Sequence, residues 1–474
     1  MKALRVLCVA ALAAGCATNP ATGKRQIMLM SEAQEIQLGR DSDAEIRKQM
    51  GVYGNAELQR YVESVGMRLA QTAHRPGLPW KFTVVDEPAV NAFALPGGFI
   101  YITRGILPYL RNEAELAAVM AHEVGHVDAR HSAQQYSNQT LAGVGLAVGS
   151  VLLPHGGDVA GAAGEAMQLA FLKNSRGDEL QADQLGVGYA ATSGWRPDAM
   201  PALLATLARI DAATGSTRGV PNWAMTHPPA ADRVERVQAA VAAAPTANTT
   251  NKEAFESHLE GIVVGDTREK GIVRGTEFIH PVLRFAVRFP QGWEVINSDE
   301  QVSARQGEQS NVAMLLQLAS GNGSPQQLAT SGMATAGWQL RDGQRTEING
   351  LEAYVGVYDG VISNTRVVLQ AAHVRAGNQT YVVAGLAPAS QYNGASRAFS
   401  QSIGTFRTIS REEADRIQPD RLDFYTVRGG DTWDALARRS ANGSVKGPTL
   451  AIMNGSDPAT PPRAGQRIRI VVGG

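Results

Sequence analysis

Two histidines and a glutamate in the segment His122-Glu123-Val124-Gly125-His126 have the residue types and the spacing that a catalytic metal requires. His122 and His126 would lie one turn apart on the same face of a helix, so their imidazoles could converge on one point. Two neutral nitrogen ligands beside a carboxylate are typical of a catalytic zinc site, in which Glu123 takes a proton from the attacking water. The alternative is a helix with two ordinary surface histidines.

The residues on both sides of this segment predict the helix that carries it, from about 113 to 131. Asn112, with Glu115 three residues later, has the pattern of a capping box. Apolar residues recur at helical spacing on a face away from the two histidines: Leu116, Met120, Val124 and Val127. A glycine inside a helix costs about 1 kcal/mol relative to alanine, so we expect Gly125 to allow another segment to approach.

A catalytic zinc usually has a third protein ligand, and the best downstream candidate is Glu179. Asp183 follows four residues later, on the same face of a predicted helix, where it could accept a hydrogen bond from a ligand histidine. The alternative for this pair is a solvated acidic helix face. Further on, His227 precedes Pro228 and Pro229 and is a candidate donor to a tetrahedral oxyanion, or else an ordinary loop histidine.

Four ordered motifs resemble the HtpX-like and BepA-like zinc metallopeptidases, which are gluzincins of peptidase family M48 and relatives of the integral-membrane prenyl-protein proteases. The resemblance covers about residues 27–241 and rests on residues 91–98, 121–127, 175–183 and 226–229, with Arg130, His131 and Arg233. It implies a mainly α, zincin-type (α+β) domain with one Zn²⁺ bound by His122, His126 and Glu179. It also implies Glu123 as the general base, Asp183 as a support for a ligand histidine and His227 as a donor to the transition state. At rest, His227 could instead occupy the open metal position and keep the enzyme latent.

In this family the strand at residues 99–103 lies at the edge of the active-site cleft, after the turn at Gly97 and Gly98 and close to Asn91. An exposed strand edge can pair with an extended substrate and read its backbone rather than its side chains. We therefore expect Asn91, Gly97 and Gly98 to belong to a substrate-binding edge. The alternative is that the strand is central in its sheet.

The N-terminus has the features of a bacterial lipoprotein signal peptide. Lys2 and Arg5 precede a short apolar run, and small residues precede Cys16. The pattern is imperfect, because Leu12 lies four residues before the cysteine instead of three. Since the chain has 2 cysteines, Cys8 and Cys16, cleavage before Cys16 leaves one thiol, which excludes an intramolecular disulfide and suits an acyl anchor. We expect a protein lipid-anchored at Cys16, at the outer membrane facing the periplasm; the alternative is a plain secreted protein.

The length of 474 residues leaves room for two or three domains, and 44 basic against 44 acidic residues give no electrostatic footprint for nucleic acid. An apolar run at residues 140–153 is shorter than the ~20 residues that cross a bilayer, so we expect a buried helix or flap there. Residues 156–164 are predicted to form a lid. The predicted segments are a signal peptide (1–15), a tether (16–26), the metallopeptidase domain (27–244), a linker (245–270), an α+β domain with an antiparallel sheet (271–410) and a C-terminal module (423–474).

The C-terminal module resembles LysM in residues 425–437, Asn454 and residues 465–470. This resemblance implies a small βααβ fold that binds N-acetylglucosamine polymers such as peptidoglycan; the alternative is a structural cap. The whole chain is thus predicted to be a zinc-dependent endopeptidase of the bacterial envelope that degrades misfolded or mis-assembled envelope proteins. Two other functions stay open: an envelope assembly factor or chaperone with little proteolysis, and a peptidoglycan-directed hydrolase.

Overall fold

The computed structural model of the chain describes residues 16–141, 174–214, 223–227, 231–298, 301–307 and 310–473. The chain divides into two compact units: the first contains Met1–Ile262, Phe424–Trp433 and Gly447–Arg469, and the second contains Val263–Asp423, Asp434–Lys446 and Ile470–Gly474. The predicted signal peptide, most of the apolar run at 140–153 and the predicted lid lie outside the described residues. Among the helices that are described, none is long and apolar enough to cross a membrane.

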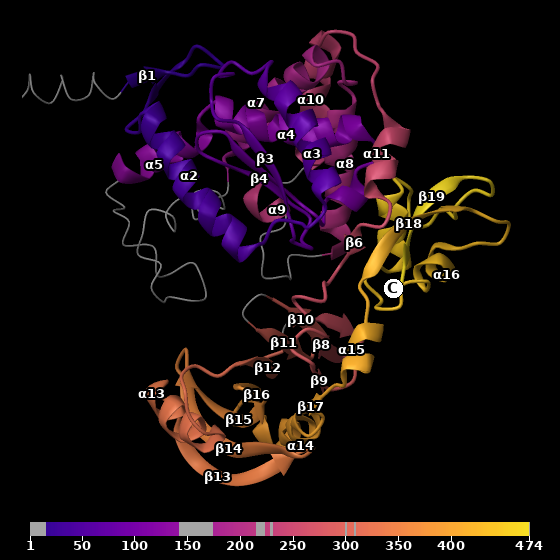
Figure 1. Cartoon of the computed structure of the whole chain (residues 1–474). Coiled ribbons are helices and arrows are strands. Elements are labelled where there is room, and N and C mark those ends of the chain that lie inside the picture. Colours follow the sequence, from indigo (N-terminus) through magenta and orange to yellow (C-terminus); the bar gives the residue numbers. More distant parts are fainter. Residues whose placement is uncertain are drawn as a thin grey trace, which may run out of the picture. The chain divides into compact units, whose positions relative to one another are not determined.

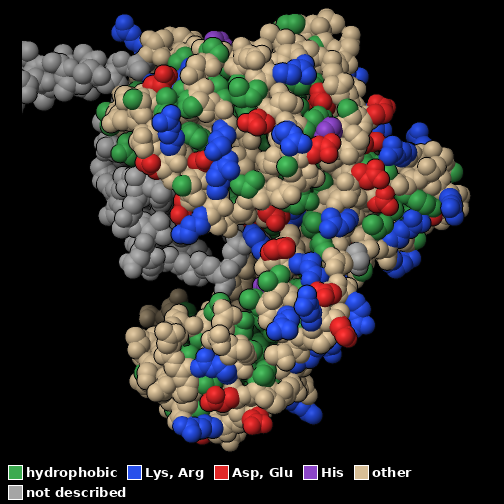
Figure 2. Space-filling view, in the orientation of Figure 1, with side chains coloured by type: hydrophobic (Ala, Val, Ile, Leu, Met, Phe, Trp, Pro, Cys, Tyr) green, Lys and Arg blue, Asp and Glu red, His purple; other side chains and the backbone are tan. Residues whose placement is uncertain are grey.

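The architecture is mixed α+β, with mainly helices in the first unit and antiparallel sheets in the second (Figure 1). This confirms the α+β, multidomain class expected from the sequence. On the face shown in Figure 2, acidic and basic side chains are interspersed, in agreement with the formal net charge of zero.

The first unit is built from helices whose N-termini are defined by short polar side chains. Ser31 forms a capping box with Gln34, since each side chain accepts the other residue's backbone N–H. At the motif helix only half of the predicted box forms. Asn112 accepts the N–H of Glu115, but the Glu115 carboxylate accepts the N–H of Arg111. The helices are α2 (Glu32–Gln49), α3 (Ala56–Ala70), η1 (Leu107–Tyr109), α4 (Glu113–Asp128), α5 (His131–Leu141), α7 (Arg176–Thr192), α8 (Ala199–Thr214), α9 (Trp223–Thr226), α10 (Ala231–Ala243) and α11 (Lys252–Leu259).

Helix α4 is the centre of the first unit, because every one of its residues is buried. The predicted single apolar stripe therefore understates its burial. Helix α7 packs so closely on α4 that a Cβ atom at Gly125 would lie 2.9 Å from the carbonyl oxygen of Ala182. A Cβ at Gly186 of α7 would lie 3.0 Å from the backbone nitrogen of His122. Gly125 thus admits a neighbouring segment, as its position in the motif predicts.

A small sheet of strands β3 (Lys81–Val85), β4 (Ala92–Leu95) and β5 (Phe99–Thr103) accompanies these helices. Its order is β3-β5-β4, with β3 parallel and β4 antiparallel to β5. The prediction that Phe99–Thr103 is an exposed edge is therefore wrong: β5 is central, and β4 is an edge strand. The turn at Gly97 and Gly98 is confirmed, and both glycines have positive φ angles, 82° and 104°.

The segment expected to be a tether contains two short antiparallel strands, β1 (Cys16–Thr18) and β2 (Arg25–Ile27). In the turn between them, Asn19 is buried, and its Nδ2 donates to the carbonyl oxygen of Ala129 at 3.0 Å. This segment therefore packs against the end of the motif helix.

The second unit consists mainly of antiparallel strands. They are β6 (Val263–Val264), β7 (Ile272–Arg274), β8 (Glu277–His280), β9 (Phe285–Arg288), β10 (Glu294–Asn297), β11 (Val302–Arg305), β12 (Ala313–Leu318), β13 (Gln339–Ile348), β14 (Leu351–Ile362), β15 (Thr365–Ala376), β16 (Gln379–Pro388) and β17 (Arg407–Thr408). Strands β7 to β17 form a seven-stranded antiparallel sheet of order β10-β11-β12-β16-β15-β14-β13 and a four-stranded sheet of order β17-β9-β8-β7.

Helix α14 (Tyr392–Ile403) packs on the larger sheet so closely that a Cβ at Gly385 would lie 2.2 Å from Cγ of Phe399. The helical segments are α12 (Pro325–Gln327), η3 (Leu328–Gly332), α13 (Met333–Thr335), α14 and α15 (Arg411–Arg416).

The C-terminal segment contains, in this order, strand β18 (Asp420–Thr426), helices α16 (Trp433–Ala437) and α17 (Gly447–Met453), and strand β19 (Arg467–Val472). Within the first unit, the buried guanidinium of Arg469 donates to the carbonyl oxygens of Met453 and Arg111, both at 3.1 Å. Arg209 of α8 donates to the carbonyl oxygen of Gly455 at 3.3 Å. Residues 447–469 are thereby joined to the start of helix α4.

The contact between α4 and α7 can be tested with the substitution Gly125→Ala. The added methyl group meets backbone and not a movable side chain, so we expect the free energy of unfolding to fall by about 1–3 kcal/mol, the usual cost of overpacking. The matched control is Gly188→Ala in α7, where an added Cβ would meet nothing within 4 Å. That variant should be more stable by about 0.5–1 kcal/mol, because alanine is the better helix former. Thermal unfolding followed by circular dichroism measures both, and equal effects of the two variants would contradict the contact.

A buried histidine in the second unit predicts a dependence of stability on pH. His373 of β15 is 3% exposed, and burial lowers its pKa to about 4. The unfolded chain, in which this pKa is near 6.5, binds more protons between these values, so stability is lost as the pH falls from about 6.5 to about 4. We expect the protection factors of amide hydrogens in β15 and β16, which are corrected for the intrinsic exchange rate at each pH, to fall over this range, and His373→Gln to weaken the fall. An unchanged pH profile in the variant would refute this assignment.

Candidate metal centre

Four buried side chains of the first unit bring one donor atom each to a common point: His122, His126, Glu179 and His227. The Nε2 atoms of His122 and His126 are 3.0 Å apart, and the Nε2 of His126 is 3.3 Å from Oε1 of Glu179. The Nδ1 of His227 lies 2.9 Å from Oε1 of Glu179 and 3.4 Å from the Nε2 of His122.

The donor atoms lie 2.9–3.4 Å apart, which is close to the spacing in a tetrahedral zinc site or somewhat tighter. Ligand atoms about 2.0–2.2 Å from a tetrahedral zinc are separated by about 3.3–3.6 Å. Nitrogen and carboxylate oxygen atoms are ligands that zinc accepts, and the burial of all four side chains keeps competing water away. The residues present therefore fit a zinc ion.

The donors come from two helices, α4 and α7, and from the residue that follows a third, α9; the three are distant in sequence. Helix α4 supplies His122 and His126 one turn apart, and α7 supplies Glu179. His227 directly follows the short helix α9, and its backbone N–H donates to the carbonyl oxygen of Trp223 at 2.8 Å. The predicted ligands His122, His126 and Glu179 are thus brought together. His227, predicted as an oxyanion donor, lies among them as a fourth donor.

Glu123 lies beside the donor cluster and not in it. Its Oε1 is 3.7 Å from the Nε2 of His227 and has no hydrogen-bond partner among the described residues. Burial raises the pKa of the Glu123 carboxyl to about 7. A buried carboxyl oxygen with a free lone pair and a pKa near neutrality can both accept and return a proton.

The ligand His122 is held in place by a carboxylate, as predicted for Asp183. The Nδ1 of His122 lies 2.9 Å from Oδ1 of Asp183. Burial lowers the pKa of His122 to about 3, so the imidazole is neutral, as a metal ligand must be. Because the Nε2 of His122 faces the cluster, its Nδ1 carries the hydrogen and donates to Asp183.

Arg233 of α10 has a role that sequence reasoning missed. Its guanidinium binds both oxygens of Asp183, at 2.8 and 2.6 Å, and forms an ion pair with Glu179. Burial alone would raise the pKa of Asp183, but the hydrogen bonds from Arg233 and His122 lower it. Burial would likewise raise the pKa of Glu179, and the adjacent His227 and His126 hold it well below its usual value. Both carboxylates therefore stay ionised. The one signal in the sequence was that Arg233 belongs to the last of the four family motifs.

Two further residues contact the metal-binding histidines, and neither had an expected role. His131, the first residue of α5, places its Nδ1 2.8 Å from the Nδ1 of His126. Trp223 stacks on His227, with ring centroids 3.9 Å apart and an angle of 14° between the planes. No local pattern in the sequence indicates either contact, since both depend on how distant segments pack.

The remaining predicted site residues lie outside the donor cluster. Asn91 directly precedes β4, and its backbone N–H donates to Oγ1 of Thr103, the last residue of β5. Gly97 lies against α2, where an added Cβ would be 2.7 Å from the Cα of Ile36. Cys16 is in β1, and its side chain lies outside the described residues.

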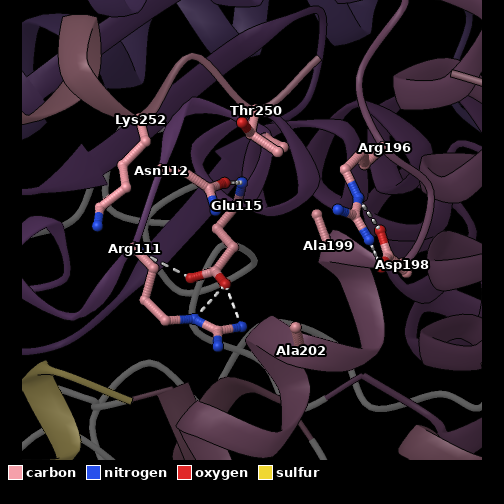
Figure 3. A pocket seen from close by; sticks show the side chains of 10 residues that line it. Arg111, Asn112, Glu115, Arg196, Asp198, Ala199, Ala202, Thr250 and Lys252 are labelled. Carbon is pink, nitrogen blue, oxygen red and sulfur yellow. Dashed lines mark hydrogen bonds and ion pairs between the residues drawn. The ribbon is translucent and has the colours of Figure 1, made fainter. Parts of the chain in front are cut away.

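A separate cavity of about 430 Å³ lies at the N-terminus of α4 (Figure 3). Its charged side chains are largely paired with one another: Arg111 binds Glu115, and Arg196 binds Asp198. None of the four donor residues lines it, so this cavity is distinct from the metal centre.

Comparison with known proteins agrees with this geometry. Residues 56–241, which contain all four donors, match the model of Peptidase family M48. The chain is 34% identical over 220 residues to the beta-barrel assembly-enhancing protease of Escherichia coli K12, and the match covers 44% of each chain. It is 31% identical over 235 residues to the mitochondrial metalloendopeptidase OMA1 of Schizosaccharomyces pombe, covering 46% of this chain and 64% of that protein.

The chain spans less than half the length of the bacterial relatives that it matches. The matched segment nevertheless includes the HExxH helix, the third ligand and the fourth donor. Residues 56–241 therefore form a metallopeptidase domain of peptidase family M48.

Proposed function

We propose that this protein is a zinc-dependent endopeptidase of the bacterial cell envelope that cleaves extended or mis-assembled envelope polypeptides. The observation that carries the proposal is the buried cluster of His122, His126, Glu179 and His227, with the unpaired oxygen of Glu123 beside it. The similarity to the beta-barrel assembly-enhancing proteases of enteric bacteria supports an envelope substrate.

The chain's own residues can perform the proton transfers of peptide hydrolysis. A zinc ion, when bound, polarises the scissile carbonyl and lowers the pKa of water. Glu123 accepts a proton from the attacking water and delivers it to the leaving amine. Asp183 orients His122, and Arg233 compensates the charge of Asp183 and Glu179. Burial of these groups excludes bulk water and strengthens their interactions.

His227 has two roles in this proposal. At rest its Nδ1, 2.9 Å from Oε1 of Glu179 and 3.4 Å from the Nε2 of His122, would be a fourth ligand of a bound zinc in the place that a substrate needs, which would keep the enzyme latent. When the side chain withdraws from the ligand set, the imidazole can donate to the oxyanion that forms on the scissile carbonyl. Trp223, stacked on His227, supports the resting orientation.

The edge of β4 that pairs with no other described strand is the proposed site for the substrate backbone. The N–H of Thr103 donates to the carbonyl oxygen of Asn91, so Asn91 and Thr103 form a hydrogen-bonded pair. Such pairs alternate along antiparallel strands, and the N–H and C=O of Ala94 therefore point away from β5. A peptide added at this edge would be recognised mainly through its backbone. This suits substrates that share an unfolded state and not a sequence.

The proposal also covers the location of the protein and the roles of the N-terminal segment, the C-terminal module and the second unit. The sequence around Cys16 supports a lipid anchor at the outer membrane, facing the periplasm. The order β18, α16, α17, β19 matches the strand–helix–helix–strand order of a LysM-like module, which supports contact with peptidoglycan. The second unit is proposed to bind or assemble polypeptides. The similarity to assembly-enhancing proteases also favours, as a second function, assistance to envelope assembly with little proteolysis.

The variant Glu123→Gln tests the peptidase mechanism. Removing the base should lower the rate of casein cleavage about 100-fold or more, because general acid–base catalysis contributes roughly 10²–10⁴-fold. Bound zinc should stay near one per chain, as measured by atomic absorption. Glu57→Gln, at a carboxylate 76% exposed, is the matched control and should retain full activity. Cleavage at the wild-type rate by the Glu123 variant would exclude this role.

The resting role of His227 can be tested on the zinc-loaded protein by X-ray absorption at the zinc edge. We expect three imidazole ligands in the wild type and two in His227→Ala. A peptidic hydroxamate should bind the variant at least about tenfold more tightly, because the fourth position is already open. Catalysis by the variant should still be slower, since loss of one oxyanion donor costs about 3–4 kcal/mol. Two imidazoles in the wild type would rule out latency through His227.

A further inference from the structure

We propose that His131 is a positioning residue that holds the metal ligand His126 in the one tautomer able to bind zinc. This inference rests on the proposed zinc site and concerns the residue that supports it. His131 is 2% exposed and lies directly behind His126, with the two Nδ1 atoms 2.8 Å apart.

The hydrogen positions along this contact follow from simple rules. The Nε2 of His126 faces the donor cluster, so it must present a lone pair and cannot carry a hydrogen. In the neutral imidazole of His126 the hydrogen is then on Nδ1. Two ring nitrogens 2.8 Å apart need one donor and one acceptor, so the Nδ1 of His131 accepts.

The next contact fixes the tautomer of His131 itself. With Nδ1 as acceptor, the hydrogen of His131 is on Nε2, which lies 2.8 Å from Oε1 of Gln181. An amide oxygen can only accept, and the nearby carboxylate oxygen of Asp178, 3.7 Å away, also attracts this N–H. A continuous chain of hydrogen bonds therefore runs from His126 through His131 to Gln181, which lies on helix α7.

The backbone brings His131 to this place by a specific turn. Helix α4 ends at Asp128, and Arg130 adopts a left-handed conformation with φ of 61°. Arg130 is held there by the carboxylate of Glu35 at 2.6 Å and by the carbonyl oxygen of Met30 at 2.7 Å. A non-glycine residue in this region is uncommon and persists where surrounding contacts hold it. His131 is thus directed beneath the last turn of α4.

The two ligand histidines have different partners, and charge explains the difference. His122 donates to the carboxylate of Asp183, whereas His126 donates to a neutral imidazole. A zinc ion together with Arg233 carries three positive charges, which equal the three negative charges of Glu123, Glu179 and Asp183. A second carboxylate at residue 131 would leave the buried cluster with net negative charge, which is costly to bury. A neutral acceptor avoids that cost.

Two substitutions that each keep one half of the imidazole separate positioning from packing. In His131→Asn, the side-chain oxygen lies near the place of Nδ1 and can still accept from His126. In His131→Gln, the amide lies near the place of Nε2, so the contact with Gln181 is kept and the acceptor for His126 is lost. Both variants stay polar and of similar size.

The experiment is a zinc competition titration of the purified full chain with a chromophoric chelator, which requires no peptidase activity. We expect His131→Gln to bind zinc about 10–100-fold more weakly, the usual effect of losing a partner of a ligand histidine, and His131→Asn to stay within about threefold of the wild type. In ¹⁵N spectra of the zinc-loaded chain, the Nδ1–H signal of His126 should show a hydrogen bond in the wild type and in His131→Asn only.

Equal zinc affinity in all three proteins would overturn the inference. An equal loss in both variants, accompanied by the same fall in thermal stability without metal, would assign His131 to packing and also overturn it. If the wild type itself binds no zinc, the proposed function fails first, and this outcome is distinct from the other two.

Discussion

The close contact between helices α4 and α7 is the constraint on which the site depends. Gly125 and Gly186 remove the side chains that would separate the helices, so the backbone of one lies against the backbone of the other. At this distance α7 places Glu179 among the metal donors, Asp183 behind His122 and Gln181 behind His131. One helix thus supplies the third ligand and supports both histidines of the other.

The charges of the metal centre are paired with one another within a small buried volume. Glu179 and Asp183 are both 0% exposed, and such charges are stable in the interior only when they are paired. Arg233 supplies that pairing for two carboxylates at once. Because the ligands must be deprotonated and held together in the folded chain, metal affinity and folding of the first unit are coupled.

Local patterns in the sequence predicted the parts of the site that depend on helical periodicity. The spacing of His122 and His126 and the pairing of Glu179 with Asp183 both follow from 3.6 residues per turn. The roles of Arg233, His131 and Trp223 did not follow, because each contacts a residue supplied by another helix. The misassignment of β5 has a similar cause: its edge position was inferred from the resemblance to the family, and the sequence of a strand does not reveal how many neighbours the strand has. Likewise α4 is buried on all sides because its covering segments come from distant parts of the chain.

The division of the chain between the two units affects how the protein can be made. The first unit is discontinuous, since it is interrupted after Ile262 and is completed by Phe424–Trp433 and Gly447–Arg469. Arg469 donates to the carbonyl oxygen of Arg111, next to the N-terminal cap of the helix that carries both ligand histidines. Residues 447–469 follow most of the second unit in the sequence, so helix α4 acquires its contact with Arg469 only after that part of the chain has been synthesised. A chain that lacked residues 447–469 would therefore lack part of the packing at the N-terminus of the helix that carries His122 and His126.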